Sequence, residues 1–255
     1  MMTFLSAAFF VLGTIVASFV GVVVARLNTG QSFLRGRSQC DACNAPLTAM
    51  ALVPIISYFF SRGRAQCCGA RISFFAPLSE ILLGGLFILA YLALGISWAL
   101  LFMLGALGLL LALVLYDLAH QILPPVVLAS FVMMSAGAGF LTAPSLTLWY
   151  ANVLSAACMA AALGAIHFLS RGRAMGLADT PLVFGLGLLT GPAAFSGFLF
   201  SFWIGAGIGI VLLAQRPRGS RMGVEVPFAP FLAAGFLLAY FTQWNIFTLI
   251  ALLGV

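Results

Sequence analysis

The chain opens with the stretch MMTFLSAAFFVLGTIVASFVGVVVAR (residues 1–26), which holds an apolar run of about 22 residues before Arg26. An α-helix needs about 20 apolar residues to cross a bilayer, whereas the apolar core of a cleaved signal peptide is shorter and follows a basic segment. No basic residue precedes this run. We therefore expect a retained first transmembrane helix in a protein of the integral membrane class.

The composition of the whole chain supports this class. Hydrophobic residues make up 64% of the 255 residues and charged residues only 6%, whereas soluble domains carry about 25% charged residues. Apolar runs of bilayer length predict an all-α polytopic membrane protein with about eight spans. The runs fall near 4–25, 74–95, 98–116, 124–142, 148–169, 181–192, 195–214 and 228–252, and the sixth is short and rich in glycine.

The basic residues indicate the topology. All eleven are arginines, and eight alternating spans put every one of them on the same side of the membrane, which the positive-inside rule identifies as the cytoplasm. Both termini are then outside. Short basic clusters between apolar runs do not form the basic face that binds nucleic acid, so the lipid bilayer is the expected partner. The arginines are Arg26, Arg35, Arg37, Arg62, Arg64, Arg71, Arg171, Arg173, Arg216, Arg218 and Arg221.

Two of the few carboxylates share this predicted cytoplasmic face. Asp117 ends the third span and Asp179 precedes the sixth. Ionisable residues close to the hydrocarbon are costly and are candidates for function. Two such aspartates can share one proton, so that one takes a proton from water while the other polarises a carbonyl, as in aspartic proteases. Alternatively, each aspartate pairs with a nearby arginine.

The local sequences resemble those of the bacterial type IV prepilin peptidases, which are membrane aspartyl proteases of the GxGD class. The matching stretches are YDLAHQILP (116–124), where Asp117 precedes a Leu-Pro element, and MGLADTPL (175–182), where Asp179 closes a Gly-x-x-Asp sequence. The resemblance implies that these two aspartates are catalytic. Ala178 departs from the family pattern, and Thr180 and Pro181 stand where a hydrophobic residue and a lysine usually follow.

Further stretches extend the resemblance along most of the chain. GTIVASFVGVVVAR (13–26) is similar to the family's opening, VPIISYFFSRGRAQCC (53–68) to its Pro-x-x-Ser-Tyr and Arg-Gly-Arg stretch, and EVPFAPFLAAG (225–235) to an element before the last span.

Four of the five cysteines lie in the long polar loop between the first two spans, at Cys40, Cys43, Cys67 and Cys68. Cytoplasmic thiols stay reduced, so a metal is favoured over a disulfide. A structural zinc site uses two Cys-x-x-Cys pairs. In the family that the chain resembles, a cysteine usually stands at position 65, where this chain has alanine. Adjacent cysteines are expected to bind one ion only with a strained backbone, so the alternative is a loop that has lost its metal.

Glu80 lies just inside the second span, and the resemblance links a glutamate there to S-adenosyl-L-methionine-dependent methylation of the new N-terminal amine. The alternative is a glutamate that pairs with Arg71 or Arg62. The expected organisation is an N-terminal, methylation-associated part (1–97) and a membrane aspartyl peptidase part (98–255). Glu225, His120 and His167 are expected to have local interfacial roles.

The resemblance thus implies an enzyme of the bacterial inner membrane with its active site on the cytoplasmic side. Its substrates would be type IV prepilins or the pseudopilins of type II secretion, cut after a glycine, and the new N-terminal residue, usually phenylalanine, would be N-methylated. Three alternatives stay open: a leader peptidase without methylation, a small proton-coupled transporter, and an accessory subunit of a secretion machine. A transporter is expected to have carboxylates at the bilayer midplane and inverted repeats, and the sequence shows neither.

Overall fold

The computed structural model describes residues 2–29, 32, 39–40, 42–43, 45–48, 52–173, 175–215 and 226–244. The end of the predicted last span, 245–252, lies outside the described residues. So do Asp41, Glu225 and the arginines Arg35, Arg37, Arg216, Arg218 and Arg221.

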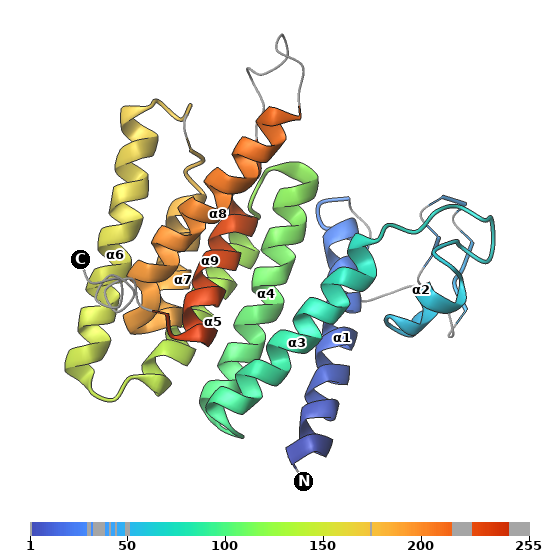
Figure 1. Ribbon diagram of the computed structural model, residues 1–255, viewed down its shortest axis with the longest axis horizontal. Helices are drawn as coiled ribbons and strands as arrows, with labels where there is room; N and C mark the ends of the chain where they lie inside the picture. The colour runs from blue at the N-terminus through green and yellow to red at the C-terminus, as the bar shows by residue number, and fades with distance from the viewer. Residues whose placement is uncertain are drawn as a thin grey trace. The chain divides into compact units, whose positions relative to one another are not determined.

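Within the described residues the regular secondary structure is helical, apart from two isolated β-bridges. Apolar segments form helices in a bilayer because a helix pairs every backbone amide and carbonyl internally. The elements, shown in Figure 1, are α1 (Met2–Arg26), α2 (Ile56–Phe60), α3 (Phe75–Leu94), α4 (Trp98–His120), α5 (Pro125–Thr142), α6 (Leu146–Leu169), α7 (Asp179–Thr190), the short 3₁₀ helix η2 (Gly191–Ala193), α8 (Ala194–Ala214) and α9 (Ala229–Thr242).

Each of the predicted spans overlaps one of these helices, and α2 is additional. Among the described residues, six segments are long and apolar enough to cross a membrane: α1, α3, α4, α5, α6 and the 34-residue segment Asp179–Leu212, which contains α7 and most of α8. Helix α9, with 14 residues, is a shorter apolar helix. The all-α, multi-pass membrane fold that the sequence predicts is confirmed.

The chain divides into two compact units, 1–96 and 97–255. In the first unit α1 packs along α3, as Figure 1 shows. The two helices approach closely at a pair of glycines, because a Cβ atom added to Gly13 would lie only 2.7 Å from the Cα of Gly84. Larger residues at this crossing would push the helices apart. This unit also contains α2 and the four loop cysteines.

Helix α7 forms the core of the second unit. It packs against α5, α6, α8 and α9, and nine of its twelve residues are buried. At about 1.5 Å per residue it is about 18 Å long, shorter than the bilayer core of about 30 Å. Neighbouring helices rather than lipid surround it, which allows a helix of this length at membrane depth.

The glycines of the short sixth span have a packing role. A Cβ on Gly185 would lie 2.7 Å from Phe131 of α5, and one on Gly187 would lie 2.8 Å from Ala156 of α6. Gly191 has a positive φ of 56° and ends α7, so the long apolar segment breaks into two helices there. Its glycine content therefore reflects close packing and a turn.

Candidate active site

Asp117 lies in the last turn of α4, at the point where the chain leaves the helix through Gln121. Its side chain is 7% exposed. The carboxylate oxygen Oδ2 accepts a hydrogen bond of 3.2 Å from the backbone amide of Ala229, the first residue of α9. The first amides of a helix have no partner within the helix. Asp117 therefore caps α9, and α9 in turn fixes the orientation of this carboxylate.

Asp179 is the first residue of α7 and is also buried, with 9% of its surface exposed. Its backbone amide donates to the carbonyl of Gly176 at 3.3 Å. Gly176 has no positive φ, and an added Cβ would make only an ordinary contact of 3.5 Å with the Asp179 carboxylate. The fold itself does not require glycine at this position.

Both aspartates belong to the second unit, and the charge of Asp117 acts electrostatically on Asp179. They come from helices α4 and α7, which are separated along the chain by the whole of α5 and α6. Two buried carboxylates that share a site can hold one proton between them, which is the arrangement that the sequence predicts.

The loop before Asp179 is tied to the end of α6. His167 Nδ1 is hydrogen-bonded to the carbonyl of Met175 at 2.8 Å. His120 stacks on Tyr116, with 4.5 Å between the ring centroids. Both histidines thus have local partners. His167 helps to position the loop that carries Asp179, a role that its place in the sequence does not indicate.

The four loop cysteines form a single cluster in the first unit. All four sulfur atoms lie within 4.8 Å of one another. The Sγ distances are 3.3 Å for Cys43 to Cys67, 3.7 Å for Cys40 to Cys68, and 3.9 Å for Cys67 to Cys68. A tetrahedral zinc with Zn–S bonds of about 2.3 Å separates its sulfurs by about 3.8 Å. The cluster therefore has the dimensions of a structural zinc site.

Two short hairpins of matching register carry these thiols. Gln39 bridges to Pro46, and Arg64 bridges to Arg71 with the same spacing. The Cys40 amide donates to the Ala45 carbonyl at 2.9 Å, and in the second hairpin Ala65 donates to the carbonyl of Ala70 at 2.8 Å. Ala65 thus occupies the position that corresponds to Cys40, and Cys67 supplies the sulfur that position 65 lacks.

The backbone at the adjacent cysteines does not show the strain in the left-handed region that the sequence led us to expect. Neither Cys67 nor Cys68 has a positive φ, and the left-handed conformation falls on the next residue, Gly69 (φ 70°). Glycine adopts it at no steric cost.

Backbone amides of Ala42 and Cys43 lower the pKa of the Cys40 thiol to about 7. The neighbouring thiols Cys43 and Cys40 raise the pKa of Cys67 to about 12.

Glu80 is buried in α3, with 8% of its surface exposed. Its Oε2 accepts a hydrogen bond of 2.6 Å from the amide of Ile55, just before α2, and the Ser18 hydroxyl of α1 also bonds to it. Within the described part of the chain these groups, rather than Arg62 or Arg71, are its partners. Glu80 therefore connects three segments of the first unit.

Comparisons with known proteins agree with this arrangement. Residues 11–94 match the family described as "Bacterial Peptidase A24 N-terminal domain". A prepilin leader peptidase/N-methyltransferase of Bacillus subtilis is 32% identical over 232 residues, which cover 91% of this chain and 92% of that protein. The chain belongs to the prepilin leader peptidase/N-methyltransferase family. Relatives with the same name are 35% identical in Myxococcus xanthus, over 82% of this chain and 63% of that protein, and 29% identical in Dickeya chrysanthemi, over 93% and 94%. No solved structure matches the chain.

For this member of the prepilin leader peptidase/N-methyltransferase family, the structure adds groups that the sequence did not single out. The amide of Ala229 is one, although the element that contains it, 225–235, stands out in the sequence. The carbonyl of Met175, which holds His167, is another. Both are backbone groups, so no pattern of side chains identifies them.

Proposed function

We propose that this protein cleaves the basic leader peptide from type IV prepilins or type II secretion pseudopilins and then N-methylates the new N-terminal residue. The peptidase half is supported by the burial of two carboxylates, Asp117 and Asp179, of which the first acts electrostatically on the second. The family name of its relatives supports both halves.

In the proposed cleavage, one aspartate is ionised and the other holds the shared proton. The ionised carboxylate takes a proton from a water molecule whose oxygen bonds to the carbonyl carbon of the scissile peptide, while the other aspartate protonates the carbonyl oxygen. Collapse of this tetrahedral intermediate returns one hydroxyl proton to a carboxylate, breaks the C–N bond and re-forms the carbonyl. The leaving amine takes its proton from the protonated carboxyl. The amide of Ala229 orients Asp117 throughout.

The site would lie at the cytoplasmic face of the bacterial inner membrane. Arg171 and Arg173 follow α6 and precede Asp179 in the chain, and arginines between spans favour the cytoplasmic side. A prepilin presents a basic leader in the cytoplasm and an apolar helix in the bilayer. A carboxylate pair at the ends of membrane helices would meet the junction between them.

The cysteine cluster would hold a zinc ion through Cys40, Cys43, Cys67 and Cys68. The observed sulfur spacing fits such an ion, because three of the distances are 3.3–3.9 Å and all four sulfurs lie within 4.8 Å of one another, close to the tetrahedral value of about 3.8 Å. The ion would supply a cross-link between the two hairpins. A short polar loop has little core of its own, so its fold would depend on this cross-link.

We assign methylation to the first part of the chain, 1–97, and cleavage to 98–255. S-adenosyl-L-methionine would be the co-substrate and would supply the methyl group. Glu80 supports this assignment as a positioning residue, because its carboxylate joins α1, α3 and the segment before α2.

Cleavage and methyl transfer can be measured separately on the full chain in lipid nanodiscs with a synthetic prepilin. Asp117→Asn and Asp179→Asn should each lower the rate of cleavage by about four orders of magnitude, since residues that act as one unit lose about as much singly as together. Methylation of a peptide that already carries the free N-terminus should continue in both variants. Near-normal cleavage by either correctly inserted variant would contradict the dyad.

A further inference from the structure

A pocket of about 500 Å³ lies next to Asp179 in the second unit. One wall consists of residues between α4 and α5 and in the first turn of α5. The other consists of residues on both sides of Asp179 in the chain. The lining residues that matter here are Leu123, Pro125 and Leu128 on the first wall, and Leu177, Thr180 and Pro181 on the second.

Both walls continue directly from the two aspartates. After Asp117 the chain leaves α4 at Gln121, which adopts a left-handed conformation with φ 55° and donates its amide to the Asp117 carbonyl at 2.8 Å. This turn leads to Leu123. Thr180 follows Asp179 immediately, and consecutive Cα atoms are about 3.8 Å apart. The pocket therefore lies next to the two segments that carry the carboxylates, and neither aspartate lines it.

The chemistry of the pocket is apolar. None of its lining residues is ionisable, and Leu123 and Leu128 are each only 6% exposed. The one side-chain hydroxyl, Oγ1 of Thr180, is buried and has no hydrogen-bond partner among the described residues. Pro181 contributes ring carbons and no backbone donor. Such a pocket favours a large apolar side chain over a small or charged one.

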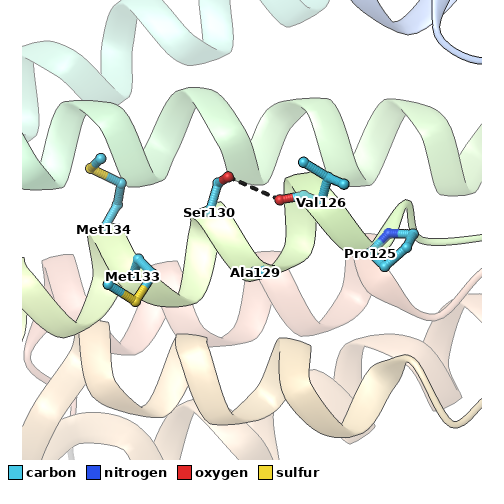
Figure 2. Close-up of a pocket in the computed structure, with 6 residues that line it drawn as sticks. All are labelled: Pro125, Val126, Ala129, Ser130, Met133 and Met134. Carbon is cyan, nitrogen blue, oxygen red and sulfur yellow. Dashed lines mark hydrogen bonds between the residues drawn. The ribbon is translucent and has the colours of Figure 1, made fainter.

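A second apolar hollow, of about 540 Å³, starts at the same proline and runs along the outer face of α5. Figure 2 shows its residues, which lie on one side of the helix: Pro125, Val126, Ala129, Ser130, Met133 and Met134. The small residues Ala129 and Ser130 lie between the larger ones. The Ser130 hydroxyl donates to the Val126 carbonyl at 2.9 Å, so the hollow presents no free donor.

The hollow runs from the first residue of α5 along this helix. From Pro125 to Met134 the helix rises by about 13 Å, and α5 is one of the segments long enough to span the bilayer. Val126 and Met133 are 77% and 71% exposed, so the face is open along its length. Flexible methionine side chains can adapt to apolar helices of different sequence.

We propose that the pocket beside Asp179 binds the side chain of the first substrate residue on the membrane side of the scissile bond, and that the α5 hollow receives the apolar helix that follows it. This inference rests on the proposed peptidase function. The shared residue Pro125 determines which side of the scissile bond these hollows receive. From Pro125 the α5 hollow runs along a membrane span and away from the aspartates, as the apolar helix of the substrate would. A basic leader would not enter it, because neither hollow offers a carboxylate.

Filling the pocket tests the first part. Four synthetic prepilins that differ only at the first residue after the cut (phenylalanine, leucine, alanine, aspartate) are compared by kcat/KM on the full protein in nanodiscs. The wild type should favour phenylalanine and leucine over alanine by at least about tenfold. Leu177→Trp should reduce this ratio to about two, because the indole occupies the pocket. Leu177 is 51% exposed, so the fold tolerates the change.

Ile122→Trp is the matched control for this experiment. Ile122 is 62% exposed, lies next to Leu123 and does not line the pocket, so its replacement should keep the substrate preference. An unchanged ratio in Leu177→Trp, or an equal loss on all four substrates, would overturn the pocket assignment. If the wild type cleaves none of the four, the proposed function fails and the pocket assignment fails with it.

Cross-linking tests the hollow without requiring turnover. A photo-reactive phenylalanine analogue replaces Met133 in the Asp117→Asn background, which keeps the substrate uncut, and Leu154 of α6 (66% exposed) receives it as the control. A prepilin adduct is expected at position 133 and not at position 154. Adducts to lipid only, or equal adducts at both positions, would overturn the α5 docking site. An adduct at 133 together with a wild type that cleaves no prepilin would support the docking site and refute the proposed peptidase function.

Discussion

At the scale of single residues, Glu80 holds the first unit together through a backbone contact. Its acceptor oxygen lies 2.6 Å from the amide of Ile55, a β-branched residue with φ 61°. A positive φ is unfavourable for such a residue and costs about 1–3 kcal/mol. The hydrogen bond from this amide to Glu80 offsets part of that cost.

Substitutions at Glu80 can distinguish the role of its hydrogen-bond-accepting oxygen from the role of its negative charge. Glu80→Gln keeps a carbonyl oxygen for the Ile55 amide and should retain most of the methylation. Glu80→Ala leaves a partly buried amide unpaired and should destabilise the first unit by about 1–3 kcal/mol, with a matching loss of methylation. Methyl transfer and thermal unfolding, measured together, check both. If Glu80→Gln is as inactive as Glu80→Ala but fully stable, the negative charge itself is needed.

At the scale of secondary-structure elements, the crossing of α1 and α3 depends on the absence of side chains. A Cβ on Gly13 would meet backbone atoms of Leu83 and Gly84 at 2.8 and 2.7 Å, whereas a Cβ on Gly21 of the same helix would meet nothing within 4 Å. Gly13→Ala should therefore destabilise the protein by about 1–3 kcal/mol, and Gly21→Ala should be neutral or stabilising by about 0.5–1 kcal/mol. Unfolding of both variants in detergent checks this; equal midpoints would rule out the close approach.

The two cysteine hairpins make a second prediction at this scale. Because Ala65 occupies the position that corresponds to Cys40, a thiol placed there should replace the one on Cys67. Wild type should bind about one zinc per chain, Cys67→Ser should lose most of it, and the double variant Ala65→Cys/Cys67→Ser should regain it. Metal content and zinc affinity of the purified proteins provide the measurement.

Cys158→Ser is the control for this series, since Cys158 lies on α6 and outside the cluster. Full zinc retention in Cys67→Ser would show that Cys67 is not a ligand. Zinc binding releases thiol protons, so zinc affinity should fall as the pH is lowered.

At the scale of the whole molecule, the topology prediction states which segments between the membrane spans face the cytoplasm. Helices α5 and α6 are each long and apolar enough to cross the membrane, so the segments before α5 and after α6 should face the same side. A reporter fused after Arg173 should report cytoplasm, and one fused at Pro144, between α5 and α6, should report periplasm. A periplasmic signal after Arg173 would refute both the topology and the proposed cytoplasmic site.

The sequence alone determined the class of the protein, its helical segments and the two aspartates that are the catalytic candidates. Hydropathy is a local property, because a segment of about 20 apolar residues forms a helix in a bilayer whatever its neighbours are. The short sixth span was the exception to bilayer length. Its glycines act through contacts with Phe131 and Ala156, which lie on other helices, so its burial could not be inferred from its own residues.

Only the tertiary structure decided how distant segments meet. The hydrogen bond from Ala229 to Asp117 joins α9 to α4, the cysteine cluster joins two hairpins, and the pocket beside Asp179 needs walls from two separate segments of the chain. Such pairings depend on the packing of whole helices and on the left-handed turns at Gln121 and Gly69. Many alternative packings satisfy the same hydropathy pattern, and the free energy that selects one of them comes from contacts between residues far apart in the chain.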